Sequence, residues 1–332
     1  MRYLILNNTT AIHSVLASKI AMVLANNGIV NVSLSPKFNN KTAGTITFGK
    51  LIAVKSFFNS IVYFLKGFRN IIITAPAVYA LPAMLLGRLF NNKVIYFLHE
   101  PNLVRNDVYS KMVNLYTYVM VYISTDIIVL SGFALSEAKV KFPSKNIVKI
   151  NYPSGLSGEV NKISRRYITF IGNLSDNKRV DMFIELAKNS SHEFLIAGSG
   201  NYAKYKNDIK SYNIKFINRF LTQNEYDALI QQSFFVVLPY ESSTQSAVLF
   251  DSYRNGTPVI TTGCGSFKEF VIQGETGYVF NIDQFISRSL LVINELNEKN
   301  SERLIGNCLH YFTRELSDRH FESKFMNFIN QI

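Results

Sequence analysis

The chain has 332 residues, of which 48% are hydrophobic and 17% are charged. This length exceeds what one hydrophobic core usually serves, so two domains are expected, and the apolar content excludes a disordered chain. The two cysteines, Cys264 and Cys308, exclude a disulfide framework and indicate a reducing compartment, and the scattered histidines give little support to a zinc site.

The net charge of +12 lies almost entirely in the first half of the chain. Residues 1–160 carry 16 Lys and Arg against 5 Asp and Glu, whereas residues 161–332 carry 19 against 18. A basic half suits nucleic acid, an anionic membrane face or a phosphorylated acceptor. Incidental surface charge explains such a one-sided excess less well.

The first half alternates short β-rich runs with helical stretches, a pattern typical of a parallel sheet covered by helices. Strands are predicted at 3–7, 71–75, 94–99, 126–131 and 146–151, and helices near 11–27, 51–68, 77–90 and 107–122. The apolar run at the N-terminus is too short for a signal peptide. The apolar stretches 71–87 and 112–135 are broken by prolines or by Asp126, so we expect strands and helices there rather than membrane spans.

Residues 152–158 are rich in turn formers and form the best candidate for a linker. The alternation of strands and helices then restarts. Strands are predicted at 167–171, 193–197, 214–217, 234–238, 258–262 and 278–280. Helices are predicted near 178–190, 222–233, 245–255 and 283–299, followed by a helical tail over 301–331. We therefore predict two doubly wound, Rossmann-like α/β domains facing across a cleft, at 1–155 and 156–317, with a helix at 318–332 packing back on the first. Ligands of such sheets bind outside the carboxyl ends of the strands, so the loops there are the candidate sites.

The first candidate loop, 170–179, leaves a strand and enters a helix. Gly172 permits close backbone approach, and Lys178 and Arg179 bring positive charge to a helix N-terminus, both of which a diphosphate needs. A surface loop with two cations is the alternative interpretation.

The second candidate loop, 196–201, is a strand followed by a turn at Gly198 and Gly200. It lacks the third glycine of a dinucleotide fingerprint, with Ala203 in that place, and indicates only a tight strand-to-helix turn.

The third candidate loop, 237–251, ends a buried strand at Pro239 and presents hydroxyl residues before a helix predicted to begin near Gln245. Ser243 or Thr244 is expected to cap that helix, whose first amides can bind phosphate. Asp251 lies about two turns into the helix, where its carboxylate can accept bonds from two ribose hydroxyls. A surface aspartate is the alternative for Asp251.

A fourth segment closes the series with Gly256-Thr257-Pro258-Val259, Glu269 and Gly274-Glu275-Thr276-Gly277. The ordered set of segments, over about 170–280, resembles the donor-binding domain of retaining family 4 glycosyltransferases, which have the two-domain GT-B fold. The chain has the family's glycine loop followed by Lys, its Pro-Tyr…Thr-Gln-Ser loop at 239–246, its Gly-x-Pro-Val strand entry and its Gly-x-Thr-Gly turn.

The chain departs from this family pattern at several positions. Asn173 stands where many members have Arg, Arg179 replaces a glycine, and Ser243 stands where many members have the first of two glutamates. The second glutamate aligns with Asp251, and Glu241 lies two residues before the first. These departures put individual donor contacts in doubt without implying an inactive protein.

The N-terminal half matches the family less well. The family's glycine-rich first loop is replaced by Asn7-Asn8-Thr9-Thr10, with His13 after it. The segment 96–102 ends a strand in His99-Glu100-Pro101 and resembles the family's turn that faces the reacting sugar. A lone histidine is more often structural, but the order of the motifs favours a site role for His99.

The resemblance implies transfer of a sugar from a nucleotide diphosphate, of the UDP or GDP type, to a saccharide or lipid-linked hydroxyl with retention, in bacterial O-antigen or capsule assembly. The diphosphate would meet Lys178, Arg179, Gly172, Asn173, Gly198, Ser243, Thr244, Gln245 and Ser246; Asp251 would hold the ribose, and His99 and Glu241 would contact the sugar or acceptor. The chain contains no Asp-x-Asp motif, so no metal or other cofactor is required.

The cationic, aromatic segment 50–69 is suited to an anionic membrane surface. Such binding would place a cytoplasmic enzyme on the inner face of the cell membrane. An ordinary domain helix explains the segment equally well. Three other functions stay open: a GT-B epimerase or phosphorylase, a catalytically silent scaffold, and a basic protein that binds nucleic acid or membrane. Motif order argues against the first, and the absence of a recognised motif argues against nucleic acid.

Overall fold

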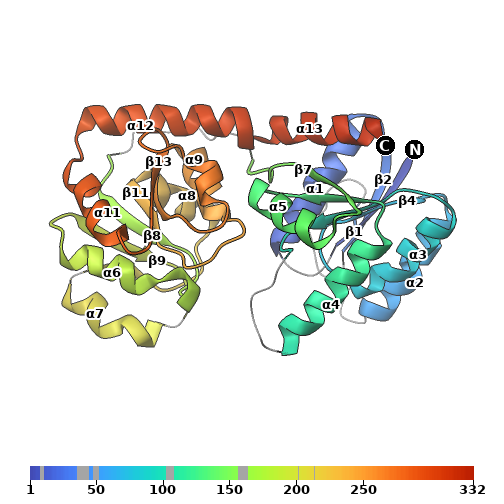
Figure 1. Ribbon diagram of the computed structural model, residues 1–332, viewed down its shortest axis with the longest axis horizontal. Coiled ribbons are helices and arrows are strands. Elements are labelled where there is room, and N and C mark those ends of the chain that lie inside the picture. The colour runs from blue at the N-terminus through green and yellow to red at the C-terminus, as the bar shows by residue number, and fades with distance from the viewer. Residues whose placement is uncertain are drawn as a thin grey trace. The chain divides into compact units, whose positions relative to one another are not determined.

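The chain divides into two units, each built on its own sheet (Figure 1). One consists of Met1–Pro153 with Phe321–Ile332, and the other of Ser154–His320. The computed structural model describes residues 1–7, 11–35, 45–47, 52–101, 108–155, 164–200, 202–212 and 214–332. The predicted first loop at 8–10, the linker residues 156–158, residues 50 and 51, Asn102 and the side chain of His13 lie outside the described residues.

The sheet of the N-terminal unit is entirely parallel, in the order β3-β2-β1-β4-β5-β6-β7. Its strands are β1 (Arg2–Leu6), β2 (Val30–Ser35), β3 (Thr45–Thr47), β4 (Asn70–Ile73), β5 (Val94–Leu98), β6 (Asp126–Val129) and β7 (Asn146–Lys149). The sequence prediction did not include β2 and β3, whose alternating apolar and polar residues differ from the continuous apolar runs of the strands that were predicted.

Helices cover both faces of this sheet. On one face, α1 (Ala11–Asn26) and α13 (Asp318–Gln331) share a core with β1, β4, β5 and β6. On the other face lie α2 (Ile52–Leu65), α3 (Leu81–Leu89), α4 (Val108–Ile123) and α5 (Gly132–Lys141). The prediction had omitted α5, whose Gly and Ser residues weaken the helical pattern.

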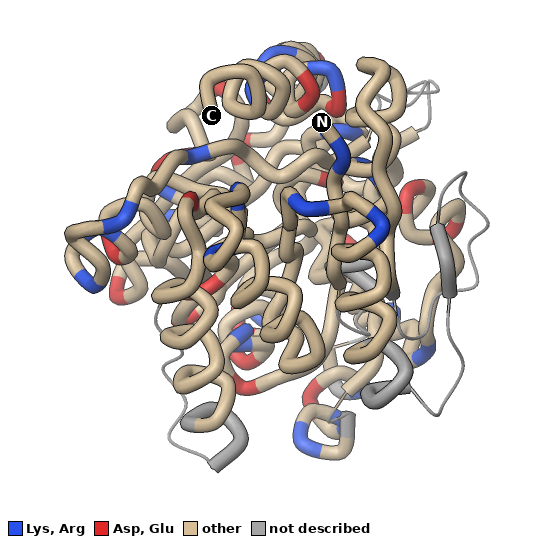
Figure 2. The backbone as a smooth tube through the Cα atoms, turned by 90° about the vertical axis from the view of Figure 1, so that its right-hand side faces the viewer, with Lys and Arg blue, Asp and Glu red and all other residues tan. Residues whose placement is uncertain are grey.

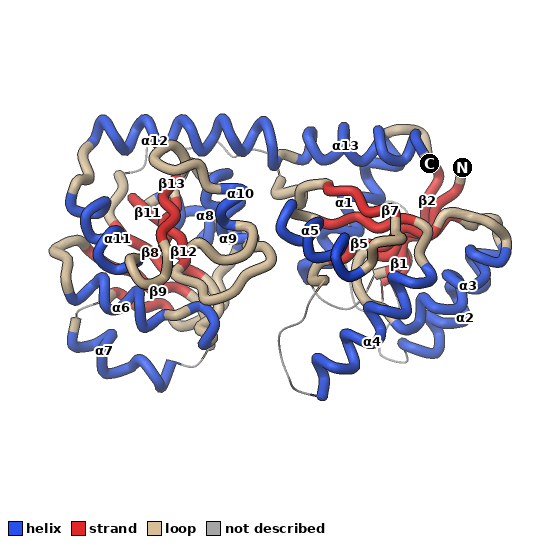
Figure 3. The backbone as a smooth tube through the Cα atoms, viewed as in Figure 1, coloured by secondary structure: helices blue, strands red, loops and turns tan. Residues whose placement is uncertain are grey.

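The sheet of the C-terminal unit is also parallel, in the order β10-β9-β8-β11-β12-β13. Its strands are β8 (Tyr167–Ile171), β9 (Glu193–Ala197), β10 (Lys215–Ile217), β11 (Ser233–Leu238), β12 (Val259–Thr262) and β13 (Gly277–Phe280). Its helices are α6 (Val180–Lys188), α7 (Lys206–Ser211), α8 (Gln223–Gln231), α9 (Ala247–Arg254), α10 (Phe267–Phe270), α11 (Phe285–Asn294) and α12 (Glu298–Tyr311). Figure 3 shows strands and helices alternating in each unit, so the predicted α/β class is confirmed.

The predicted helical tail is interrupted. A π-helical turn at Phe312–Leu316 follows α12, and Ser317 then has extended backbone. The Ser317 side chain accepts a hydrogen bond from the His320 amide at 3.3 Å, which starts α13. No helix within the described ranges is long and apolar enough to cross a bilayer.

Each sheet has one point at which its strand order reverses. In the N-terminal unit this point lies between β1 and β4, and in the C-terminal unit between β8 and β11. The connections there leave in opposite directions, and ligands of such sheets bind at the carboxyl ends of the strands on either side of this point.

Candidate active site

Two predicted loops meet at the switch point of the C-terminal sheet. One follows β8 and carries Lys178, and the other follows β11 and begins with Pro239 and Tyr240. The Lys178 ammonium donates a hydrogen bond to the Tyr240 hydroxyl at 3.0 Å and lies 4.5 Å from the centroid of the same ring. The sequence had named Tyr240 only as a motif member, and the fold makes it the side chain that positions Lys178.

Glycines bring the backbones of neighbouring loops into contact. A Cβ atom at Gly198, where φ is +149°, would lie 1.8 Å from the Gly172 carbonyl oxygen. A Cβ atom at Gly172, where φ is +132°, would lie 3.3 Å from the Lys178 ammonium. Asn173 lies against Gly200, where a Cβ atom would come within 2.7 Å of the Asn173 Oδ1 atom. These positions therefore require glycine. Glycine would also let a ligand approach the backbone closely there.

Arg179 lies beside Lys178 in the sequence but has a different environment. Its backbone is left-handed, with φ +47°, which is uncommon for a residue other than glycine. Its guanidinium donates to both oxygens of the Asp181 carboxylate, at 2.8 Å for the shortest pair. Arg179 is therefore already ion-paired, and Lys178 is the cation that faces the loop after β11.

The loop before α9 corrects the predicted start of that helix. The helix begins at Ala247 rather than near Gln245, and its N-cap is Ser246, not Ser243 or Thr244. Ser243 instead donates to the Gln245 carbonyl at 3.1 Å, with Thr244 and Gln245 half-buried in the same loop. Gly265 explains the difference, because a Cβ atom there would lie 1.6 Å from the Ser243 carbonyl oxygen, and this close contact helps to keep the loop extended.

The N-terminus of α9 lies beside the loop after β8, since a Cβ atom at Gly172 would come within 4.0 Å of Val248 in its first turn, and it has no side-chain cap. Ser246 has extended backbone and is buried, yet its side chain makes no capping hydrogen bond among the described residues. Amides of an uncapped first turn need an acceptor, and together with the helix dipole they suit an anion such as phosphate.

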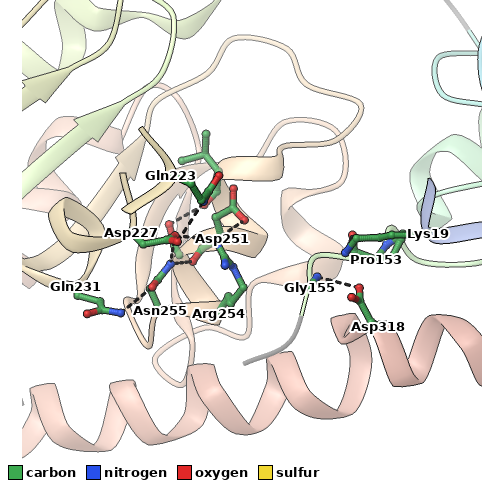
Figure 4. Close-up of polar contacts among 12 residues, drawn as sticks. Lys19, Pro153, Gly155, Gln223, Asp227, Gln231, Asp251, Arg254, Asn255 and Asp318 are labelled. Atoms are coloured by element: carbon green, nitrogen blue, oxygen red, sulfur yellow. Dashed lines mark hydrogen bonds and ion pairs between the residues drawn. The ribbon is translucent and has the colours of Figure 1, made fainter. Parts of the chain in front are cut away.

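Asp251 lies about one turn further along α9, within a polar network (Figure 4). Its side chain is only 23% exposed, and its Oδ1 atom is 3.3 Å from the Arg254 guanidinium. Burial raises the pKa of the carboxyl to about 6, although Arg254 and the Tyr226 hydroxyl favour the charged form. Asp251 is therefore not the freely exposed helix aspartate that sequence reasoning had left open.

Sequence reasoning missed the residues that surround Asp251. Asp227 on α8 accepts from Arg254 at 2.7 Å and from Asn255 at 2.9 Å, and Gln231 donates to Asn255 at 2.9 Å. Their residue types are ordinary on helix surfaces, so only the packing of α8 against α9 makes them a network.

Glu241, which follows Tyr240, has a different environment from the carboxylates of Asp251 and Asp227. Its side chain is exposed, whereas its backbone amide donates to the Asn177 carbonyl at 2.8 Å and thereby ties the loop after β11 to the loop after β8. The carboxylate also interacts electrostatically with Arg179.

His99 belongs to the N-terminal unit, at the end of β5. Its Nε2 atom lies 2.7 Å from the carbonyl oxygen of Thr74, the residue after β4. Burial lowers the pKa of the imidazole, with the Thr74 bond opposing, so the ring is neutral at pH 7. The Thr74 hydroxyl donates to the Asn7 side chain at 3.0 Å across the β1–β4 switch point. His99 is thus held beside the crevice of its own sheet.

Comparison with known proteins agrees with this architecture. Residues 165–294 match the sequence model of the family described as glycosyl transferases group 1. An uncharacterized glycosyltransferase of Methanocaldococcus jannaschii is 23% identical over 254 residues, covering 72% of this chain and 70% of the relative.

Solved glycosyltransferase structures share the fold over the full chain. HepE of Anabaena, solved in complex with UDP, has a TM-score of 0.72 at 12% identity and covers 99% of this chain and 100% of its own. The apo lipopolysaccharide outer core galactosyltransferase WaaB has a TM-score of 0.72 at 13% identity, covering 100% of both chains. These structures show that the chain has the two-domain α/β fold called GT-B, as predicted. The family match over residues 165–294 and the Methanocaldococcus jannaschii relative identify the protein as a glycosyltransferase.

Proposed function

We propose that this enzyme transfers a sugar from a nucleotide diphosphate to a hydroxyl of a saccharide or lipid-linked saccharide. The observation that carries the proposal is that Lys178 and the uncapped N-terminus of α9 both lie beside Gly172, at one switch point. The leaving diphosphate gains negative charge as the glycosidic bond breaks, and a fixed ammonium with oriented amides stabilises that charge. The complex of HepE with UDP supports a nucleotide donor.

The donor is proposed to bind along the loops that glycines bring together. The diphosphate lies against Lys178 and the segment Ser243–Ser246, with Gly172, Asn173 and Gly198 providing backbone approach. Asp251 accepts hydrogen bonds from the ribose hydroxyls, and its charged form is favoured for this because both carboxylate oxygens are then acceptors. Arg179 makes the smaller contribution, because Asp181 already neutralises it.

The N-terminal unit is proposed to receive the acceptor. Neutral His99 is suited to hydrogen bonding with a sugar hydroxyl, and exposed Glu241 is the second candidate for contact with the sugar or acceptor. Retention of anomeric configuration follows from the resemblance to family 4. The likeness to WaaB supports a role in bacterial surface polysaccharide assembly, such as O-antigen or capsule. The excess of cations in residues 1–160 favours a cytoplasmic enzyme held at an anionic membrane surface.

Isothermal calorimetry with UDP, GDP and ADP tests the donor site. We expect one nucleotide to bind, and Lys178→Ala to weaken it roughly 10- to 100-fold, the effect of losing a charge-assisted hydrogen bond. Arg179→Ala is the matched control and should cost less than about threefold, since its guanidinium is already paired. Folded protein that binds none of the nucleotides, or equal losses in both variants, would contradict the proposed site.

A further inference from the structure

Three neighbouring helices of the N-terminal unit expose large apolar side chains. Helix α3 packs against both α2 and α4, and all three cover the same face of the sheet. Their outward surface, here called the docking face, consists of Phe58, Val62, Leu65, Leu85, Leu89, Phe90, Met112, Leu115, Tyr118, Val119 and Tyr122. Exposed apolar patches of this kind mark surfaces that meet a protein or a membrane.

The spacing of these residues shows that α4 has two apolar sides. Met112, Leu115, Val119 and Tyr122 recur at helical spacing and are exposed, whereas Met120 and Val121 lie in the core. Leu115 is 63% exposed and Tyr122 is 81% exposed, so neither is needed for packing within this unit. The outer stripe of α4 is therefore largely exposed to solvent in the described part of the unit, and Tyr122 has the Lys145 ammonium 5.6 Å from its ring centroid.

Charge decides which partner suits the docking face. Residues 1–99 contain no Asp or Glu at all, and the span of α2 and α3 contributes Lys66, Arg69 and Arg88, which are exposed. Figure 2 shows Lys and Arg positions in blue on a backbone whose helices are otherwise largely tan. A second copy of the chain would bring like charges together, whereas an anionic bilayer complements both the cations and the apolar side chains.

A hollow at the edge of the docking face carries two cations. Its volume is about 570 Å³, and Arg88, Lys145, Ser124, Ser144 and Tyr122 are among the residues that line it. The Lys145 ammonium donates to the carbonyls of Tyr122 at 2.6 Å and Ser124 at 2.9 Å, which holds it at the C-terminal end of α4. No acidic side chain lines this hollow within the described structure.

The electrostatics of the hollow favour an anion. Burial lowers the pKa of Lys145, and the positive charge of Arg88 lowers it further. A phosphate group would offset the repulsion between these two positive charges, because it accepts hydrogen bonds from the guanidinium, the ammonium and serine hydroxyls.

We propose that the docking face lies on a bilayer containing anionic phospholipid, and that Arg88 and Lys145 hold a headgroup phosphate in the hollow beside it. Phe58, Leu89, Leu115 and Tyr122 enter the interfacial region of the bilayer, where aromatic and aliphatic side chains beside cations are favoured. This inference refines the membrane part of the proposed function and is independent of which sugar donor the enzyme uses.

Flotation of the full chain with vesicles tests the inference. We expect binding to vesicles of phosphatidylcholine with phosphatidylglycerol, weakened by salt, and none to phosphatidylcholine alone. The combined change Leu89→Gln, Leu115→Gln and Tyr122→Gln should lower the partition coefficient more than about tenfold, because the buried apolar area is lost. Arg88→Gln should lower it about fivefold, the effect of one cation near an anionic surface.

Matched controls lie in the C-terminal unit. Phe220→Gln with Leu291→Gln removes exposed apolar side chains, and Arg288→Gln removes an exposed cation; both should bind vesicles as the wild type does. Absence of binding to anionic vesicles, equal losses in the controls, or a concentration-dependent dimer in place of vesicle binding would overturn the inference. Calorimetry with nucleotide on the same variants should give unchanged affinity, which separates failure of this surface from failure of the donor site.

Discussion

At the scale of single residues, the negative charge of Asp251 lowers the free energy of unfolding. Its carboxyl has a pKa raised to about 6, chiefly by burial, and Arg254 offsets only part of this because it lies closer to Asp227. A carboxyl perturbed in this way, beside the proposed donor site, is typical of a functional group rather than of a stabilising one.

The pH dependence of stability should report on this carboxyl. The folded state holds the Asp251 proton more tightly than the unfolded state, so this residue makes stability fall as pH rises from about 4 to about 6, after which the cost is constant. We expect Asp251→Asn to remove that dependence, to raise the free energy of unfolding at pH 7.5 by about 1–3 kcal/mol, and to weaken nucleotide binding at least about tenfold.

Thermal unfolding between pH 4 and 8 measures this effect, with Asp227→Asn as the control. That control removes the negative charge that pairs with Arg254 at 2.7 Å and should lower stability at neutral pH. A loss of stability in Asp251→Asn would show that the carboxylate serves the fold instead of the ligand.

Single residues also show how far sequence can predict a site. Lys178 and Arg179 are adjacent and chemically alike, and nothing in the sequence distinguishes their roles. The structure pairs one with Asp181 and turns the other toward Tyr240, because the left-handed backbone at Arg179 changes the direction of the chain between them. Tertiary contacts of this kind have no local pattern from which they could be predicted.

At the scale of elements, the backbone contact between Gly172 and Gly198 holds the loops after β8 and β9 together. The Gly172 amide donates to the Ala197 carbonyl at 2.9 Å, and the space between the two glycines admits no side chain. The proposed donor site therefore depends on the register of two strands as much as on its polar residues.

Gly198→Ala should disturb this contact severely. Both the positive φ and the 1.8 Å clash oppose a Cβ atom, so we expect a loss of about 2 kcal/mol or more in the free energy of unfolding together with weaker nucleotide binding. Gly306→Ala on α12 is the control, because a Cβ atom there has nothing within 4 Å and alanine favours helix by about 0.5–1 kcal/mol. Denaturant unfolding of both variants measures the difference; equal stabilities would refute the close contact.

Elements with continuous apolar runs were predictable, and those defined by their neighbours were not. Strands β8 and β9 begin and end where the sequence predicted, since each is buried and bounded by polar residues. The start of α9 was predicted two residues too early, because the contact of Gly265 with Ser243 lies outside the local sequence.

At the scale of the whole molecule, the last helix returns to the first unit. Helix α13 follows elements of the C-terminal unit, yet Phe321, Phe325 and Phe328 are buried in the core of the N-terminal unit. The ring centroid of Phe325 lies 5.4 Å from that of Phe321 and 6.2 Å from that of Phe97 in β5. The N-terminal core therefore requires both ends of the described chain.

Phe325→Ala should destabilise the N-terminal unit by about 3–5 kcal/mol, the usual cost of an aromatic cavity. Nucleotide binding should persist below the unfolding transition, because Lys178 and Asp251 belong to the other unit. Phe220→Ala, at a side chain that is 88% exposed, is the control and should leave stability within about 0.5 kcal/mol. Calorimetric unfolding checks the prediction, and an effect no larger than that of the control would contradict it.

The sequence by itself determined the α/β class, most strand positions, the basic first half and the loops that carry the candidate donor site, because hydrophobic period and turn residues act locally. Only the tertiary structure decided which cation faces the crevice, where α9 begins, which residues surround Asp251 and which sides of α2, α3 and α4 stay exposed. Each of these depends on contacts between residues far apart in the chain, and such contacts form only when the strands and helices have packed.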